Sequence, residues 1–67
     1  MIKASKNLKK YLDITEISYT EFAKKIGFDL PTVSQVLAGK EEPSKTFIEQ
    51  VILQTDLKFD SAFEVSE

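Results

Sequence analysis

The chain has 67 residues and a formal net charge of −2 at pH 7, with nine lysines and no arginine, histidine or cysteine. This length allows one small domain, 1–67, and the composition excludes disulfides, thiolate chemistry and the histidine that most often serves as general base or metal ligand. The longest apolar run, 51–53, is too short to span a bilayer, and nothing resembles a signal peptide. We therefore expect a soluble, cytoplasmic protein with no membrane contact.

The first predicted helix spans about residues 5–13. Leu8, Tyr11 and Leu12 recur at helical spacing, and the hydroxyl group of Ser5 can cap the start of the helix. This pattern predicts that one face packs against a core, while the lysines of the segment lie mostly on the other faces.

The second predicted helix begins after Ser18 and ends at Gly27. Ser18 followed by Glu21 forms a capping box, and a glycine can adopt the left-handed conformation that ends a helix. The buried stripe is expected to contain Phe22, Ala23 and Ile26. Because Ala23 is small, a following helix can cross close to this one.

The third predicted helix follows Asp29, which can cap it, and ends at Gly39. Pro31 is tolerated in its first turn because the amides there lack intrahelical partners. Its core face is expected to contain Val33, Val36 and Leu37. Together the second and third helices, 19–38, indicate a helix-turn-helix unit, and such a unit usually places its second helix in the major groove of DNA.

A polar loop over residues 40–43 separates this unit from a fourth predicted helix. Ser44 can cap that helix, but Thr46 and Glu49 form a competing capping box two residues later, so its start stays open. The buried face is expected to contain Phe47, Ile48, Val51 and Ile52.

A short fifth helix around residues 59–63 is expected to close the core. We find no β-hairpin signal, and we expect frayed ends over about 1–4 and 65–67. The predicted fold is therefore all-α, a compact five-helix domain with a central helix-turn-helix.

Charge is unevenly distributed along the chain. Residues 1–40 carry seven lysines and four acids, whereas residues 41–67 carry two lysines and seven acids. One end of the domain could therefore face phosphate while the other stays away from it. The alternative interpretation is a solvated surface with a chance gradient of charge.

Four motifs occur in order along the chain: Ser18-x-x-Glu21-Phe22-Ala23-x-x-Ile26-Gly27, Thr32-Val33-Ser34, Gly39-Lys40-x-x-Pro43-Ser44 and Leu57-x-Phe59-Asp60. In this order the sequence, over about residues 8–63, resembles helix-turn-helix domains of the Cro/lambda-repressor type (the XRE family), which are five-helix DNA-binding domains of phage repressors and bacterial regulators. The resemblance implies that the third helix is the recognition helix and that the second lies across the DNA backbone. It also implies that the fourth and fifth helices complete the core and carry a dimer contact.

The resemblance implies DNA base contacts just after the start of the third helix and one turn later, from Leu30, Pro31, Thr32 and Gln35. Gln35 is the best candidate for a specific contact, because a glutamine amide can bond the N6 and N7 edge of adenine. Thr32 can hydrogen-bond several bases or touch a thymine methyl group. Leu30 and Pro31 replace the polar residues usual in the family, so they could meet thymine methyl groups or a protein partner.

Implied contacts with the DNA backbone come from Tyr19, Ser34, Lys40, Lys24, Lys10 and Lys6. The Tyr19 hydroxyl group can donate to phosphate, whereas Ser34 either contacts phosphate or bonds back to its own helix. Glu41 and Glu42 would repel phosphate if they faced it. With few phosphate contacts, useful affinity needs a dimer on two half-sites roughly 34 Å apart.

We therefore expect a sequence-specific DNA-binding transcriptional regulator, a small phage or mobile-element repressor that occludes a promoter as a homodimer on double-stranded DNA through its fourth and fifth helices. Cofactors, metals and enzymatic activity are not expected, because the acids lack the ligand spacing of a calcium loop. The alternative is a protein-interaction module on the same scaffold, such as an antirepressor or a partner-binding regulator domain. The chain could also be the amino-terminal domain of a longer regulator.

Overall fold

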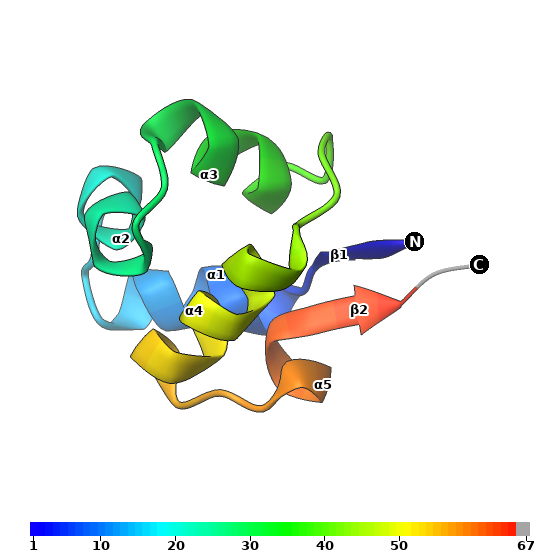
Figure 1. Ribbon diagram of the computed structural model, residues 1–67. Coiled ribbons are helices and arrows are strands. Elements are labelled where there is room, and N and C mark those ends of the chain that lie inside the picture. Colours follow the sequence, from blue (N-terminus) through cyan, green and yellow to red (C-terminus); the bar gives the residue numbers. More distant parts are fainter. Residues whose placement is uncertain (66–67) are drawn as a thin grey trace.

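The computed structural model describes residues 1–65, which form five helices and two short strands (Figure 1). In chain order the elements are β1 (Ile2–Ala4), α1 (Lys6–Ile14), α2 (Tyr19–Ile26), α3 (Leu30–Leu37), α4 (Lys45–Thr55), α5 (Phe59–Ala62) and β2 (Phe63–Val65). The protein is therefore mostly helical, with a small sheet beside α5. No helix among residues 1–65 is long and apolar enough to cross a membrane.

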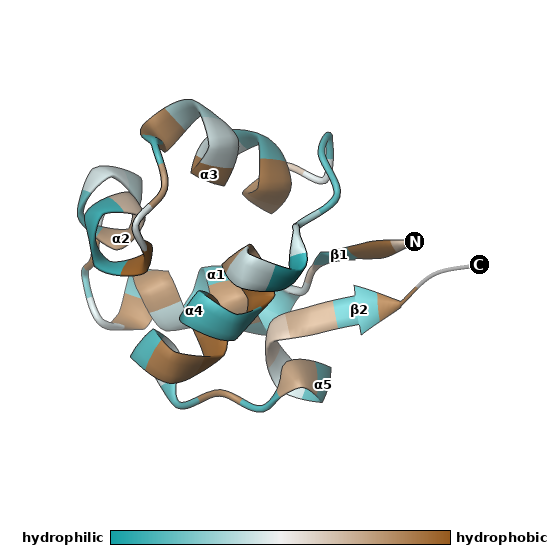
Figure 2. Ribbon diagram, in the orientation of Figure 1, coloured by the Kyte–Doolittle hydropathy of each residue, from teal (hydrophilic) through white to brown (hydrophobic). Residues whose placement is uncertain are grey.

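One apolar core holds the helices together. Its buried side chains come from every helix and from β2: Leu8, Leu12, Phe22, Ala23, Ile26, Val33, Val36, Leu37, Phe47, Val51, Ala62 and Phe63. Apolar and hydrophilic residues alternate at helical spacing along the ribbon, so each helix turns one stripe inward (Figure 2). The ring of Phe47 on α4 lies 4.9 Å from the ring of Phe28, between centroids, and so joins α4 to the turn before α3.

Three serines begin helices where the sequence predicts caps. The Oγ atoms of Ser5, Ser18 and Ser44 accept hydrogen bonds from backbone N–H groups three residues later, at 3.4, 3.2 and 3.2 Å. Ser44, rather than Thr46, therefore starts α4. The Ser18 hydroxyl group also donates to Glu21 Oε1 at 3.3 Å, so Glu21 contacts the side chain of Ser18 and not its backbone N–H, and only half of the predicted capping box is formed.

The turn between α2 and α3 is built at Gly27. This residue has a φ of 77° and ends α2 in the left-handed conformation, as predicted. The backbone N–H of Phe28 then donates to the carbonyl group of Ala23 at 3.0 Å. Only residues 27–29 separate the two helices, so α3 is held at a fixed position against α2.

The all-α prediction is wrong in one respect, because β1 and β2 pair as antiparallel strands. Ile2 lies opposite Val65, Lys3 opposite Glu64 and Ala4 opposite Phe63. Residues 2–4 and Val65, predicted to fray, therefore belong to a sheet, and the predicted fraying at 66–67 lies outside the described residues. The strands come from opposite ends of the chain, so no turn signal between neighbouring segments announces their pairing.

Ser5 fastens the start of α1 to the end of α5. Its backbone N–H donates to the carbonyl group of Ala62 at 2.9 Å, and its side-chain hydroxyl group donates to the carbonyl group of Ser61. The residue is only 4% exposed. One buried serine therefore caps a helix and joins the two ends of the chain.

We expect Ser5→Ala to lower the free energy of unfolding by about 1–2 kcal/mol, because it removes a cap and leaves a carbonyl group without its partner. Ser18→Ala is the matched control, since Ser18 is an exposed cap with no tertiary hydrogen bond. Urea denaturation of both variants measures the difference. An equal loss in the two variants would show that the bond between Ser5 and Ser61 adds nothing.

Candidate functional site

Helix α3 exposes one face to solvent and buries the other. Val33, Val36 and Leu37 are buried, as predicted, while the exposed residues are Leu30, Pro31, Ser34, Gln35 and Ala38. Leu30, Ser34 and Ala38 are spaced four apart, so they form one ridge along the helix. We call these three residues the α3 ridge. Pro31 and Gln35 lie beside it, one turn apart.

The loop after α3 forms hydrogen bonds with the backbone at the end of the helix. The carbonyl group of Gln35 accepts hydrogen bonds from the backbone N–H groups of Lys40 at 2.9 Å and Glu41 at 3.3 Å. The Gln35 side chain is exposed and bonds to no other group among residues 1–65. Its amide group is therefore available to a ligand, as the sequence interpretation requires.

The Thr32 side chain is less available to a ligand than the sequence suggests, because it is half-buried and interacts with Asp29. Its hydroxyl group interacts with the Asp29 carboxylate and lowers the pKa of Asp29 from 3.8; desolvation opposes this effect, and the backbone N–H groups of Thr32 and Asp29 add weaker effects that lower the pKa. Asp29 occupies the cap position of α3, but its side chain forms no capping hydrogen bond, so the predicted side-chain cap is not formed. The negative charge at the start of α3 therefore competes with a ligand for the Thr32 hydroxyl group.

Thr32→Val should raise the pKa of Asp29 toward 3.8, since valine keeps the shape of threonine but has no hydroxyl group. A carboxylate whose pKa is lowered by folding stabilises the protein above about pH 4, and the effect is lost as pH falls through the folded-state pKa. NMR titration of the Asp29 carboxyl carbon in both proteins measures the shift. Identical pKa values would contradict the assigned interaction.

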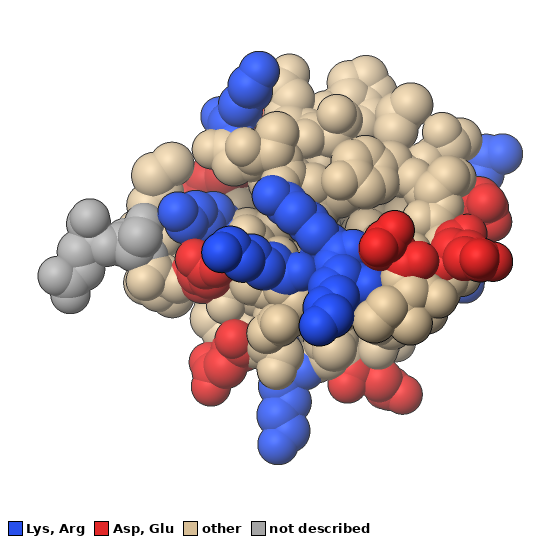
Figure 3. Space-filling view, turned by 180° about the vertical axis from the view of Figure 1, so that it is seen from behind, with Lys and Arg blue, Asp and Glu red and all other residues tan. Residues whose placement is uncertain are grey.

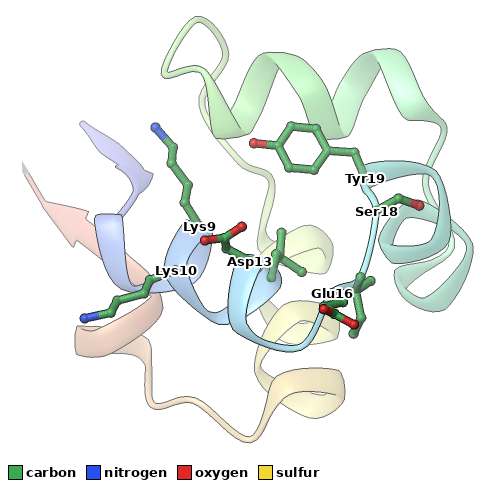
Figure 4. A pocket seen from close by; sticks show the side chains of 8 residues that line it. Lys9, Lys10, Asp13, Glu16, Ser18 and Tyr19 are labelled. Atoms are coloured by element: carbon green, nitrogen blue, oxygen red, sulfur yellow. The ribbon is translucent and has the colours of Figure 1, made fainter.

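An open hollow of about 790 Å³ lies between α1 and the start of α2. Its lining residues are Lys9, Lys10, Leu12, Asp13, Glu16, Ile17, Ser18 and Tyr19. The side chain of Tyr19 points into the space below α3, Lys9 points toward the end of α3, and Lys10 points away from Tyr19 (Figure 4). Two lysines and two acids line this hollow, so their formal charges cancel.

A second hollow of about 330 Å³ lies between β1, the start of α1 and the end of α3. Its lining residues are Lys3, Ala4, Lys6, Lys9, Leu37, Ala38, Gly39 and Glu64. Lys9 belongs to both hollows, so the two adjoin along α1. Three lysines and one acid line the second hollow, which is therefore the more basic of the two. Lysines gather near the centre of one face of the molecule (Figure 3).

The structure brings some of the predicted phosphate contacts together and separates others. Tyr19 and Lys10 line the first hollow and Lys6 lines the second, whereas Lys24 and Lys40 line neither. Lys24 follows Tyr19 by five residues on α2, so the two side chains leave the helix in different directions. Ser34 lies on the α3 ridge.

Sequence reasoning missed Lys3 and Lys9 as members of this basic region. Lys9 follows Lys6 by three residues on α1, a spacing that places both on one side of a helix and could have indicated it. Lys3 reaches the region only through the pairing of β1 with β2, for which the sequence has no local signal. No protein-family model matches the sequence, and no curated protein matches it.

Proposed function

We propose that this chain is a sequence-specific DNA-binding regulator of the helix-turn-helix type, which inserts α3 into the major groove of double-stranded DNA. The observation that carries the proposal is the exposed face of α3, where Pro31, Ser34 and Gln35 are open to solvent while the opposite face is fixed in the core. The major groove is wide enough to admit such a helix. The short turn at Gly27 supports the proposal, because it sets α3 rigidly against α2.

The resemblance to the Cro/lambda-repressor type adds the expected mode of action, a repressor that occludes a promoter as a homodimer. Leu53 on α4 is 69% exposed, and an apolar side chain on this helix suits a dimer contact through α4 and α5. Two copies related by a two-fold axis would read two half-sites roughly 34 Å apart.

Selection from a pool of random duplexes tests this proposal. We expect one sequence to be enriched, and we expect Gln35→Ala to lose about 1–3 kcal/mol of preference at one base pair. Gln54→Ala on α4 is the matched control, because Gln54 is also an exposed glutamine on a helix. If no sequence is enriched, or if both variants keep the full preference, the proposal fails.

A second candidate function is favoured by one observation. Leu30, at the start of α3, is 42% exposed and stands beside Pro31, so the face of α3 begins with an apolar pair. Such a pair suits a protein-interaction module on the same scaffold, for example an antirepressor. A protein binder should be sensitive to Leu30→Glu and indifferent to Gln35→Ala, whereas a DNA reader should lose sequence preference with Gln35→Ala.

A further inference from the structure

We propose that Lys3, Lys6 and Lys9 form a phosphate-binding surface that holds the backbone of one DNA strand beside the carboxy-terminal end of α3. We call these residues the lysine triad. The inference rests on the proposed function, because the docked position of α3 determines where the DNA backbone lies. It assigns the main phosphate contact to β1 and α1, rather than to Lys40 in the loop after α3.

The lysine triad is held in place relative to α3. All three residues line the second hollow together with Leu37, Ala38 and Gly39 at the end of that helix. β1 contacts α3, and the backbone N–H of Ile2 donates to Glu42 Oε1 at 2.9 Å. This bond ties β1 to the loop after α3. A phosphate group bound by the triad would therefore have a defined position relative to the α3 ridge.

The charges of the triad are available to a ligand. All three lysines are exposed, and none forms an ion pair with a carboxylate among residues 1–65. Glu64 is the acid that lines the same hollow, opposite Lys3 in the sheet. Glu42, which accepts from the Ile2 N–H, places a second carboxylate beside Lys3, so the triad's three positive charges stand against two negative charges. The remaining positive charge attracts an anion, and ammonium groups bind phosphate as compact point charges.

Three of the last carbonyl groups of α3 have hydrogen-bond donors other than the triad. There the carbonyl groups of Ser34, Gln35 and Val36 already accept hydrogen bonds from the N–H groups of residues 38, 40 and 39, at 3.0, 2.9 and 3.1 Å. Lysines often lie near the end of a helix to complement such carbonyl groups. These three carbonyl groups therefore do not require the lysines as hydrogen-bond donors, and the ammonium groups can bind an external anion.

The arrangement of the two hollows favours an extended anion over a single phosphate ion. The α3 ridge ends at Ala38, which lines the second hollow; Tyr19 points below α3, and Lys9 points toward the end of that helix and lines both hollows (Figure 4). A strand of DNA that followed the ridge would meet the Tyr19 hydroxyl group and then the triad. Asp13 and Glu16 offset the lysines of the first hollow, so the triad supplies most of the attraction.

The test compares two triple variants of the full chain with equal loss of charge. One changes the triad, K3Q/K6Q/K9Q, and the control changes three exposed lysines that line neither hollow, K25Q/K45Q/K58Q. Affinity is measured by fluorescence anisotropy from about 50 to 200 mM salt, for a selected duplex and an unrelated duplex. Circular dichroism checks that both variants fold. If the triad variant does not fold, the single variants K3Q, K6Q and K9Q are measured in its place.

We expect the triad variant to reduce the slope of log affinity against log salt by about 2 to 3, or about 0.9 for each single variant, with the same loss on both duplexes. The control should keep the slope of the original protein.

If the triad variant and the control behave alike while the original protein still prefers the selected duplex, the inference is overturned and the proposed function stands. If the triad variant lowers the slope but no duplex is preferred, the triad stands and sequence-specific reading fails. If no duplex binds at low salt, both fail.

Discussion

Replacing Phe47 with alanine is expected to lower the free energy of unfolding by about 3–5 kcal/mol, which is a third or more of the protein's stability. Phe47 is 1% exposed, and its ring lies 4.9 Å from that of Phe28 between centroids, so it fills the space between α4 and the turn before α3. Removing a buried phenylalanine ring costs about 3–5 kcal/mol. A domain of this size has a total stability of about 3–10 kcal/mol, so this loss removes much or all of it.

Thermal denaturation followed by circular dichroism measures this effect. Glu49→Ala is the matched control, because Glu49 is exposed on the same helix and should change stability by less than about 0.5 kcal/mol. If Phe47→Ala unfolds cooperatively at a melting temperature close to that of the control, the packing of the Phe47 ring on α4 does not stabilise the core as expected.

The second large effect is expected for Ser34→Glu, which should weaken DNA binding by about a hundredfold or more. Ser34 lies in the middle of the α3 ridge and is exposed, so in the docking we propose the new carboxylate would face the DNA. Like charges brought together at an interface cost several kcal/mol. Glutamate has a good helix propensity, so α3 should remain folded.

The control for Ser34→Glu is Ile14→Glu, which adds the same charge to a position on α1 that is exposed, lines neither hollow and lies outside the proposed dimer contact. Gel-shift titration with the selected duplex measures both variants. We expect Ile14→Glu to bind within a few-fold of the original protein, because long-range repulsion between exposed charges is screened by salt. Equal losses in both variants would mean that the added charge, and not its place on α3, weakens binding.

Local signals in the sequence predict the helices well. Ser5, Ser18 and Ser44 each form the predicted cap, because a cap depends only on a side chain and an N–H group three residues away. Gly27 is likewise left-handed as predicted. At Ser44 the local signals compete with Thr46, and the structure places the helix start at the earlier residue.

The sheet could not be predicted in the same way. The pairing of Lys3 with Glu64 depends on contacts between opposite ends of the chain. Phe63, which sequence periodicity places in the fifth helix, instead leaves α5 and enters β2 with its side chain still buried. A three-residue strand is too short to show an alternating pattern, so only the tertiary structure reveals it.

The candidate site also has one part that local sequence predicts and another that depends on tertiary contacts. The exposed face of α3, with Gln35, follows from helical periodicity, and the sequence predicts it. The lysine triad combines β1 with α1 and the end of α3, so it emerges only after the sheet has formed. The half-buried position of Thr32 beside Asp29 also depends on the three-dimensional structure.

NMR titration of the isotope-labelled protein with the selected duplex tests whether α3 contacts DNA. If α3 enters the major groove, the largest amide shifts should fall on residues 30–38, with a second group at β1 and the start of α1. Exposed residues of α4, such as Leu53 and Gln54, should shift only if the protein dimerises on the DNA. Shifts confined to α4 and α5, with none on α3, would mean that α3 does not contact the DNA.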